Sequence, residues 1–190
     1  LWLTKNWILA ILLRQQAAKI SNPLASSSPG SLNVLMSRTQ FHGGYNFKLG
    51  ERARDPKVQT MFGIYKFRAF VDDSDPVALT TVEYYGYSLA LNGSLPVDDE
   101  GLWQVGGELL FGLTSGLSES PVDSGGASTA TINNFSFFAS KKISDNLHFR
   151  GVLSIEGYGA NFSGSSTRPD PATSMTHRLT QFLFGADWFF

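Results

Sequence analysis

The residues near the carboxyl end of the chain alternate between two kinds of side chain at every second position. In the segment RLTQFLFGADWFF, residues 178–190, one set is mainly aromatic: Phe182, Phe184, Ala186, Trp188 and Phe190. The other set is mixed: Leu179, Gln181, Leu183, Gly185 and Asp187. Because successive side chains of a β-strand point to opposite faces, a period of two predicts a strand and excludes an amphipathic helix.

The same alternation recurs along the whole chain and predicts eight strands. Their approximate ranges are 5–17, 32–49, 57–71, 79–91, 102–114, 131–142, 147–159 and 178–190. The short segment ISDN at 143–146 joins two of them as a hairpin. Residues 7–13 are apolar on both faces, and the tyrosines at 84, 85 and 87 fall on both faces, so the register of 79–91 stays open.

The composition indicates which surroundings these strands have. Aromatic residues make up 13% of the chain and charged residues only 16%, whereas soluble domains carry roughly 25% charged residues. The longest apolar run, WILAILL at 7–13, is far shorter than the ~20 residues of a membrane-spanning helix. An apolar composition without a long apolar run is typical of barrels whose lipid-facing and lumen-facing residues alternate. We therefore predict an all-β fold, an antiparallel transmembrane β-barrel of about 8 strands in a single domain, 1–190.

Loop lengths predict how the barrel is oriented. Segments 18–30, 115–131 and 160–177 are long and rich in Ser, Gly, Pro and Thr, whereas 50–56, 92–100 and 143–146 are short. Bacterial barrels have long loops outside and short turns in the periplasm, which places both termini on the periplasmic side. Connection 72–78 is short although it falls on the outer side. This topology gathers aromatic residues at the periplasmic boundary: Trp2, Tyr45, Phe47, Trp103, Trp188 and Phe190.

The last nine residues, FLFGADWFF, resemble the C-terminal signature of bacterial outer-membrane β-barrel proteins. The matching residues are Phe182, Phe184, Trp188 and Phe190. The resemblance implies a location in the bacterial outer membrane, with its lipid and lipopolysaccharide as partners, and an assembly signal read by the barrel-assembly machinery. Since the chain begins at Leu1 and shows no complete signal peptide, we expect a mature or trimmed protein. The alternative is the last strand of a soluble sheet.

A second likeness covers residues 9–50, which are similar to a hairpin of the outer-membrane transporter family associated with phenol-degradation (meta-pathway) gene clusters. The matching residues are Arg14, Gln15, Gln16, Asn33, Gln40, Tyr45 and Asn46. Members of that family have longer chains and more strands. The likeness therefore implies a larger barrel that here lacks N-terminal strands.

The alternation assigns nine charged residues to the lumen. They are Arg14, Arg38, Lys66, Arg68, Glu83, Glu108, Arg150, Glu156 and Asp187. An eight-strand barrel is just wide enough for side chains to fill it, and lone buried ions are costly. We therefore expect an ion-paired network that includes Arg150 and Glu108, and the alternative is a wet path for small solutes.

Catalytic and ligand motifs do not emerge from the chain. His148 and Ser154 share a strand face but are six residues, roughly 20 Å, apart, and we expect His42 and His177 to be boundary or loop residues. The chain has no cysteine, no His or Cys metal-ligand spacing, and a net charge of −1 that gives no basic field for nucleic acid. We therefore expect no enzyme activity, no cofactor, no metal site and no nucleic-acid partner.

Three function classes fit these observations. The first is porin-like passage of small solutes across the outer membrane, with a small-molecule solute as partner. The second is a structural or surface-interaction barrel with a plugged lumen and no transport. The third, a soluble ligand-binding barrel of lipocalin type, requires an apolar interior and a polar exterior, whereas here the charged residues gather on one face of the strands and the aromatics on the other, with the terminal Phe on the aromatic face. We expect the first.

Overall fold

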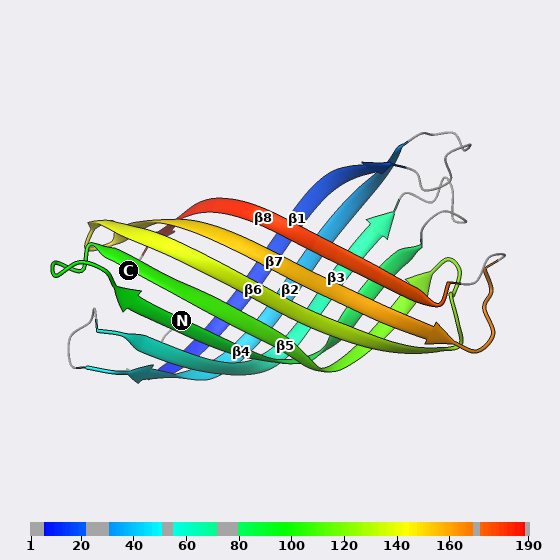
Figure 1. Ribbon diagram of the computed structural model, residues 1–190, viewed down its shortest axis with the longest axis horizontal. Helices are drawn as coiled ribbons and strands as arrows, with labels where there is room; N and C mark the ends of the chain where they lie inside the picture. Colours follow the sequence, from blue (N-terminus) through cyan, green and yellow to red (C-terminus); the bar gives the residue numbers. More distant parts are fainter. Residues whose placement is uncertain (1–5, 22–30, 51–54, 72–79, 169–171, 189–190) are drawn as a thin grey trace.

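Eight antiparallel strands follow one another around a single curled sheet in the computed structural model (Figure 1). The structure describes residues 6–21, 31–50, 55–71, 80–168 and 172–188. The strands are β1 (Trp7–Ser21), β2 (Ser31–Lys48), β3 (Lys57–Val71), β4 (Thr81–Pro96), β5 (Trp103–Ser120), β6 (Ala127–Ser144), β7 (Leu147–Ser163) and β8 (Ser174–Trp188). Their number, type and order agree with the prediction. Within the described ranges no helix is long and apolar enough to cross a membrane.

The sheet curls into a half-barrel that is open between β1 and β8. Every strand pairs with the next, but no backbone pairing joins β1 to β8 among the described residues. A side-chain hydrogen bond crosses this opening, from Gln181 Nε2 of β8 to Gln16 Oε1 of β1 at 3.0 Å. In Figure 1 the two strands cross near their labels and separate toward both ends of the sheet. We call the line between β1 and β8 the seam.

The connections define two ends of the barrel. Segments 22–30, 72–80, 121–126 and 164–173 join strands at one end, which we call the loop end. Segments 49–56, 97–102 and 145–146 join strands at the other, the turn end. In Figure 1 the loop end lies to the right. Each strand therefore has a loop-end half and a turn-end half.

In the turn-end half, large apolar side chains point outward, and the inward side chains include polar residues together with buried apolar ones such as Ile8, Met61 and Phe138. On β3, Phe62 and Ile64 are more than half exposed, whereas Met61 between Phe62 and Thr60 is buried. The outward apolar residues form a continuous belt: Trp7, Ile11, Leu13, Phe41, Phe47, Phe62, Ile64, Leu91, Leu95, Trp103, Leu109, Phe111, Leu113, Phe135, Phe137, Phe149, Leu153, Ile155, Phe182 and Phe184. Buried polar residues face the lumen behind it: Gln40, His42, Asn46, Ser88, Ser136, Ser140 and Ser154.

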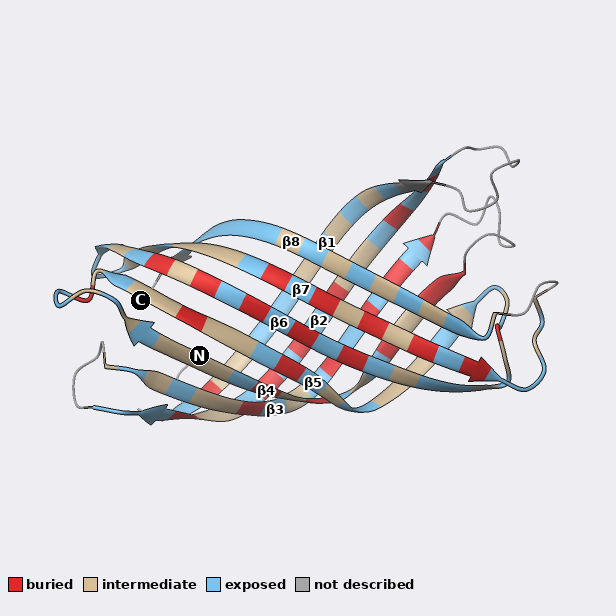
Figure 2. Cartoon of the chain, in the orientation of Figure 1, coloured by how far each residue is buried: buried red, intermediate tan, exposed pale blue. Residues whose placement is uncertain are grey.

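In the loop-end half this arrangement is reversed. Buried apolar residues fill the lumen there: Leu32, Val34, Phe67, Ala69, Val71, Val82, Tyr84, Ile132, Tyr158, Ala160 and Phe162. The outward positions between them are mostly polar: Asn33, Ser37, Thr39, Lys66, Arg68, Glu83, Ser118, Asn133, Asn161, Thr176 and Arg178. Figure 2 shows buried and exposed residues alternating along β6 and β7.

The reversal explains why predicted strands are too short at the loop end, although at the turn end β4 also continues past its predicted limit of 91, to Pro96. β1, β5 and β7 continue at the loop end beyond the predicted limits of 17, 114 and 159, and β6 and β8 begin before 131 and 178. The prediction followed outward apolar residues, and in these added segments the outward residues are polar or small. The alternation of side chains continues along these strands, but in the loop-end half the apolar side chains occupy inward positions instead of outward ones.

A β-bulge resolves the register of β4. The pairing of β4 with β5 shifts between Tyr87 and Ser88, with Leu113 as the extra residue of β5. Tyr84 points inward and is fully buried, whereas Tyr85 and Tyr87 are about half exposed on the outer face. Gly86 lies between them opposite the bulge, where an added Cβ would come within 1.8 Å of the Thr114 carbonyl oxygen. The close approach of the two backbones therefore requires glycine at this position.

Candidate functional site

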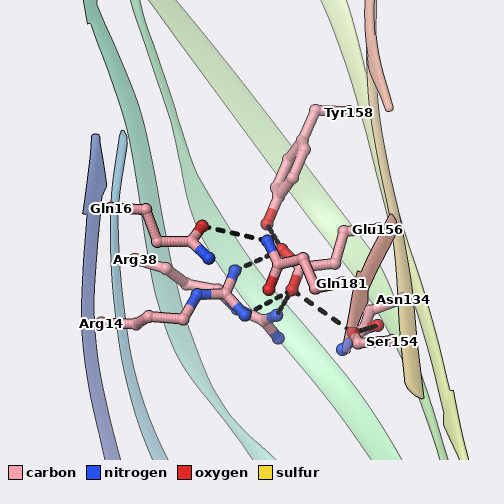
Figure 3. Close-up of polar contacts among 8 residues, drawn as sticks. All are labelled: Arg14, Gln16, Arg38, Asn134, Ser154, Glu156, Tyr158 and Gln181. Atoms are coloured by element: carbon pink, nitrogen blue, oxygen red, sulfur yellow. Dashed lines mark hydrogen bonds and ion pairs between the residues drawn. The ribbon is translucent and has the colours of Figure 1, made fainter. Parts of the chain in front are cut away.

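Glu156 lies at the centre of the lumen, where the polar and apolar halves meet. It is inward-facing on β7 and its side chain is fully buried. Arg14 of β1 binds it with both terminal nitrogens, Nη1 to Oε1 at 2.7 Å and Nη2 to Oε2 at 2.7 Å. Arg38 of β2 binds Oε1 through Nη1 at 2.8 Å. Two arginines from one side of the barrel thus converge on one carboxylate from the other (Figure 3).

Neutral donors complete the surroundings of this carboxylate. The Tyr158 hydroxyl donates to Glu156 Oε2 at 2.7 Å. Ser154 lies 3.4 Å from Oε1 and donates to Asn134 Oδ1 at 3.1 Å. One acid between two bases leaves the Arg14–Glu156–Arg38 cluster with a formal charge of +1. We call these three residues the lumen triad.

An aromatic layer closes the lumen on the loop-end side of the triad. The rings of Phe67 and Tyr158 stack with their centroids 3.9 Å apart. Tyr84 and His177 pack around them, and the Tyr84 hydroxyl lies 3.4 Å from His177 Nδ1. These four side chains come from β3, β4, β7 and β8, so the layer crosses the barrel from wall to wall.

On the turn-end side of the triad the lumen holds a cavity of about 750 Å³. Its walls combine polar inward residues with apolar residues of the seam strands. The polar members are Arg14, Arg38, Gln40, His42, Gln59, Asn92, Glu108, Asn134, Ser136, Arg150 and Ser154. The seam members are Ile8, Ala10, Ile11, Leu12, Leu13, Leu183, Phe184 and Gly185.

Arg150 and Glu108 point inward, as predicted, but they do not join the triad. The Arg150 guanidinium lies 3.9 Å above the centre of the Phe138 ring, and its buried Nε has no hydrogen-bond partner among the described residues. Glu108 accepts a hydrogen bond of 3.3 Å from Asn92. Neither forms an ion pair in the described part of the chain. The ion-paired network is therefore smaller than expected.

Three residues predicted in the lumen lie on the outer face instead. Lys66 and Glu83 form an ion pair of 2.8 Å there, with Lys66 54% exposed. Arg68 lies over the outward Phe70 ring at 5.4 Å. The prediction for Lys66, Arg68 and Glu83 is wrong because it turned charges inward throughout, whereas in the loop-end half the inward neighbours are Tyr65, Phe67 and Tyr84.

The remaining predicted residues lie partly outside the described part of the chain. Of the aromatic residues in the terminal signature, Phe182 and Phe184 point outward and are strongly exposed. The side chains of Asp187 and Trp188, together with Phe190 and Trp2, fall outside the described residues. At the turn end, Trp7 packs on Tyr45 and Tyr45 on Phe47, while Lys141 lies over Trp103.

Two inward histidines were missed by the sequence analysis. His42 of β2 is buried and hydrogen-bonds to Ser88 of β4 at 2.7 Å. His177 of β8 belongs to the aromatic layer. The expectation that both are boundary or loop residues is wrong. The alternation of β2 contains the signal for His42, since it shares the parity of Arg38 and Gln40.

The described residues contain no group of His, Cys, Asp or Glu side chains arranged to hold a metal ion. Comparison of the chain with protein-family models, with curated proteins and with solved structures finds no match. A functional proposal therefore rests on the geometry of the lumen. Its features are a charged triad, a packed loop-end half, and a cavity with polar and apolar walls that reaches the seam.

Proposed function

We propose that this chain is an integral barrel of the bacterial outer membrane whose lumen is plugged. The turn-end half lies in the hydrocarbon, and the loop-end half stands in water on the outer side. The observation that carries the proposal is the reversal of the two faces at the height of the lumen triad. The proposed role is non-catalytic.

The belt of outward apolar residues supports the membrane part of the proposal. Side chains such as Phe62, Phe111 and Phe135 are 45–52% exposed while polar residues are buried behind them. A soluble barrel would show the opposite pattern, because large exposed apolar surfaces are unfavourable in water. The loop-end half does show that opposite pattern. Hydrocarbon around the turn-end half and water around the loop-end half therefore account for the two opposite patterns.

The outward cations at the edge of the belt fit this placement. Lys66 and Arg68 on β3 and Arg178 on β8 lie just beyond the last belt residues of their strands, Ile64 and Phe182. At this height they meet the headgroup layer, where cationic side chains bind the phosphates of lipopolysaccharide. The terminal strand β8 with its outward Phe182 and Phe184 is the proposed contact for the barrel-assembly machinery.

A plugged lumen is supported by the packing of the loop-end half. Phe67, Tyr84 and Tyr158 are at most 2% exposed and cross the barrel. Porin-like passage is the second candidate, and the polar cavity in the turn-end half favours it. The two candidates differ in whether a continuous water path runs past the aromatic layer.

Arginine substitutions on β5 test the membrane placement. Leu109→Arg puts a charge in the middle of the belt and is expected to lower the free energy of unfolding in lipid vesicles by about 2–4 kcal/mol. Ser118→Arg, outward on the same strand but beyond the belt, is the matched control and is expected to change it by less than about 1 kcal/mol. Urea titration of the vesicle-embedded protein measures both. Equal effects at the two positions would contradict the placement.

Planar-bilayer recording tests the plug. Fusion of barrel-carrying vesicles with the planar bilayer, which delivers barrels that are already inserted, is expected to give no steady conductance, because the aromatic layer and the triad fill the cross-section of the barrel. Uptake of small polar solutes into vesicles carrying the barrel should equal that of empty vesicles. Steady single-channel steps, or uptake above that of empty vesicles, would favour the porin-like candidate instead.

A further inference from the structure

The cavity in the turn-end half differs from a water-filled vestibule in the nature of its walls. Toward the barrel axis it meets guanidinium, amide and hydroxyl groups, and toward the seam it meets the side chains of Leu12, Leu183 and Phe184. Ile11 and Leu13 of β1 also border it, although their side chains are exposed on the outer face. The cavity therefore passes between β1 and β8 to the outside of the barrel.

The polar end of the cavity has an excess of positive charge. Arg14, Arg38 and Arg150 line it, and Glu108 is the acidic residue among its lining. Glu156 is shared by Arg14 and Arg38, whereas Arg150 has no carboxylate partner among the described residues and keeps a buried Nε without an acceptor. Because Arg150 lines the cavity and has no carboxylate partner among the described residues, its guanidinium favours an anion from outside the chain.

Space is left beside this guanidinium. A Cβ on Gly185, the β8 residue paired with Arg150, would meet no atom within 4 Å. On the other side of Arg150, the ring of Phe138 occupies the room left by Gly106, where an added Cβ would lie 2.4 Å from the ring. Phe138 supports the guanidinium from one side, and the opposite side opens into the cavity.

From these features we propose that the cavity binds an amphiphile with a carboxylate head and a single alkyl chain, which enters from the membrane through the seam. The head binds Arg150, and the chain lies between Leu12 and Leu183 and leaves the barrel past Leu13 and Phe184. The volume of about 750 Å³ lies within the 300–1,000 Å³ typical of small-molecule sites. This inference rests on the proposed function, since the seam must face hydrocarbon.

The seam provides the route because no backbone pairing joins β1 to β8 among the described residues. Closing it would pair the backbones of β1 and β8, which hydrocarbon strongly favours. The structure shows the open form, in which the Gln16–Gln181 hydrogen bond links the two strands at the height of the triad. A ligand seated between the strands binds only the open form and shifts the population toward it.

Binding is tested with dodecanoate as the probe and the barrel embedded in phosphatidylcholine nanodiscs, by calorimetric titration against empty nanodiscs. Dodecanoate is expected to bind more tightly than its methyl ester. Arg150→Met should weaken dodecanoate binding by about 10- to 100-fold and leave the ester unchanged, as expected for a lost charged hydrogen bond. Arg68→Met, an arginine on the outer face, is the matched control and should leave both unchanged. Equal affinities for acid and ester would overturn the proposal.

Two further variants test the proposal even if the Arg150→Met protein fails to fold. Gly185→Leu projects from a position where an added Cβ meets no atom within 4 Å, and it should abolish binding of both probes while the barrel stays embedded. Gln16→Cys with Gln181→Cys, in a chain that has no other cysteine, allows a short bismaleimide to link the seam, and linking should slow dodecanoate association at least about tenfold. Unchanged binding in Gly185→Leu, or an unchanged rate after linking, would contradict the site or the route. A barrel that embeds but does not bind overturns this inference alone, whereas one that fails to embed overturns the proposed function.

Discussion

Replacing Glu156 by Gln is expected to lower the free energy of unfolding by about 3–5 kcal/mol, because it leaves two buried arginines without their counter-ion. Arg14 and Arg38 lie 2.7 and 2.8 Å from Oε1, and their side chains are 16% and 6% exposed. Both guanidinium groups are therefore largely withdrawn from water, which compensates only partly for the lost charge. Glutamine keeps the shape of the side chain, so the effect reports charge and not volume.

Glu108→Gln is the matched control on the same inner face. Glu108 accepts one hydrogen bond from Asn92 and makes no ion pair in the described part of the chain, so its loss should cost less than about 1.5 kcal/mol. Urea unfolding in detergent micelles measures both variants. A triple variant, Glu156→Leu with Arg14→Met and Arg38→Met, should recover most of the stability, since apolar replacement of a whole buried ion cluster is often neutral. Equal losses in Glu156→Gln and Glu108→Gln would show that the triad is solvated.

Phe67→Ala is expected to lower the free energy of unfolding by about 3–5 kcal/mol, the usual range for a buried phenylalanine. Phe67 is 1% exposed and stacks on Tyr158 from the opposite side of the barrel. Its removal opens a void in the aromatic layer that β3, held in the sheet on both sides, cannot close.

Phe62→Ala provides the comparison five residues earlier on the same strand. Phe62 is 52% exposed on the belt and stacks on Tyr87, so truncation should cost about 0.5–1.5 kcal/mol. Both are measured by thermal unfolding on semi-native gels and by urea titration. A larger loss for Phe62→Ala than for Phe67→Ala would mean that the inner and outer faces of β3 have been exchanged.

The strand positions were predictable because the strand backbone itself turns successive side chains to opposite faces, whatever surrounds each face. The turn-end half of β7 shows this best, since Phe149, Leu153 and Ile155 alternate with Arg150, Ser154 and Glu156. Strand pairing then follows from sequence order, as each strand pairs with its neighbour in the chain. The open seam was not predictable, because nothing in β1 or β8 encodes whether their backbones meet.

The faces were predictable only where the surroundings stayed the same along the strand. On β3 the inward residues run from Met61 to Phe67 and Val71, and the outward ones from Phe62 to Lys66 and Arg68. The rule that apolar residues face lipid gives the correct face for the residues of β3 up to Ile64 and the wrong face for the residues after it. The change of phase shows only after the strands are paired and their heights are compared. For the same reason Arg14, Arg38 and Glu156 could be assigned to the lumen, but their convergence could not.

The polar outer surface of the loop-end half affects how the barrel can reach its place in the proposed orientation. Lys66, Arg68, Glu83 and Arg178 must cross the hydrocarbon before they reach the far side, since β1 begins and β8 ends at the turn end, which is the near side. At about 2–4 kcal/mol for a lipid-facing lysine or arginine at the midplane, their joint crossing adds a kinetic barrier on the order of 10 kcal/mol. Spontaneous insertion into an intact bilayer is therefore slow, and a locally thinned membrane or an insertion catalyst accelerates it. The same barrier opposes the movement of these four side chains back across the hydrocarbon, so they keep the inserted barrel in its orientation.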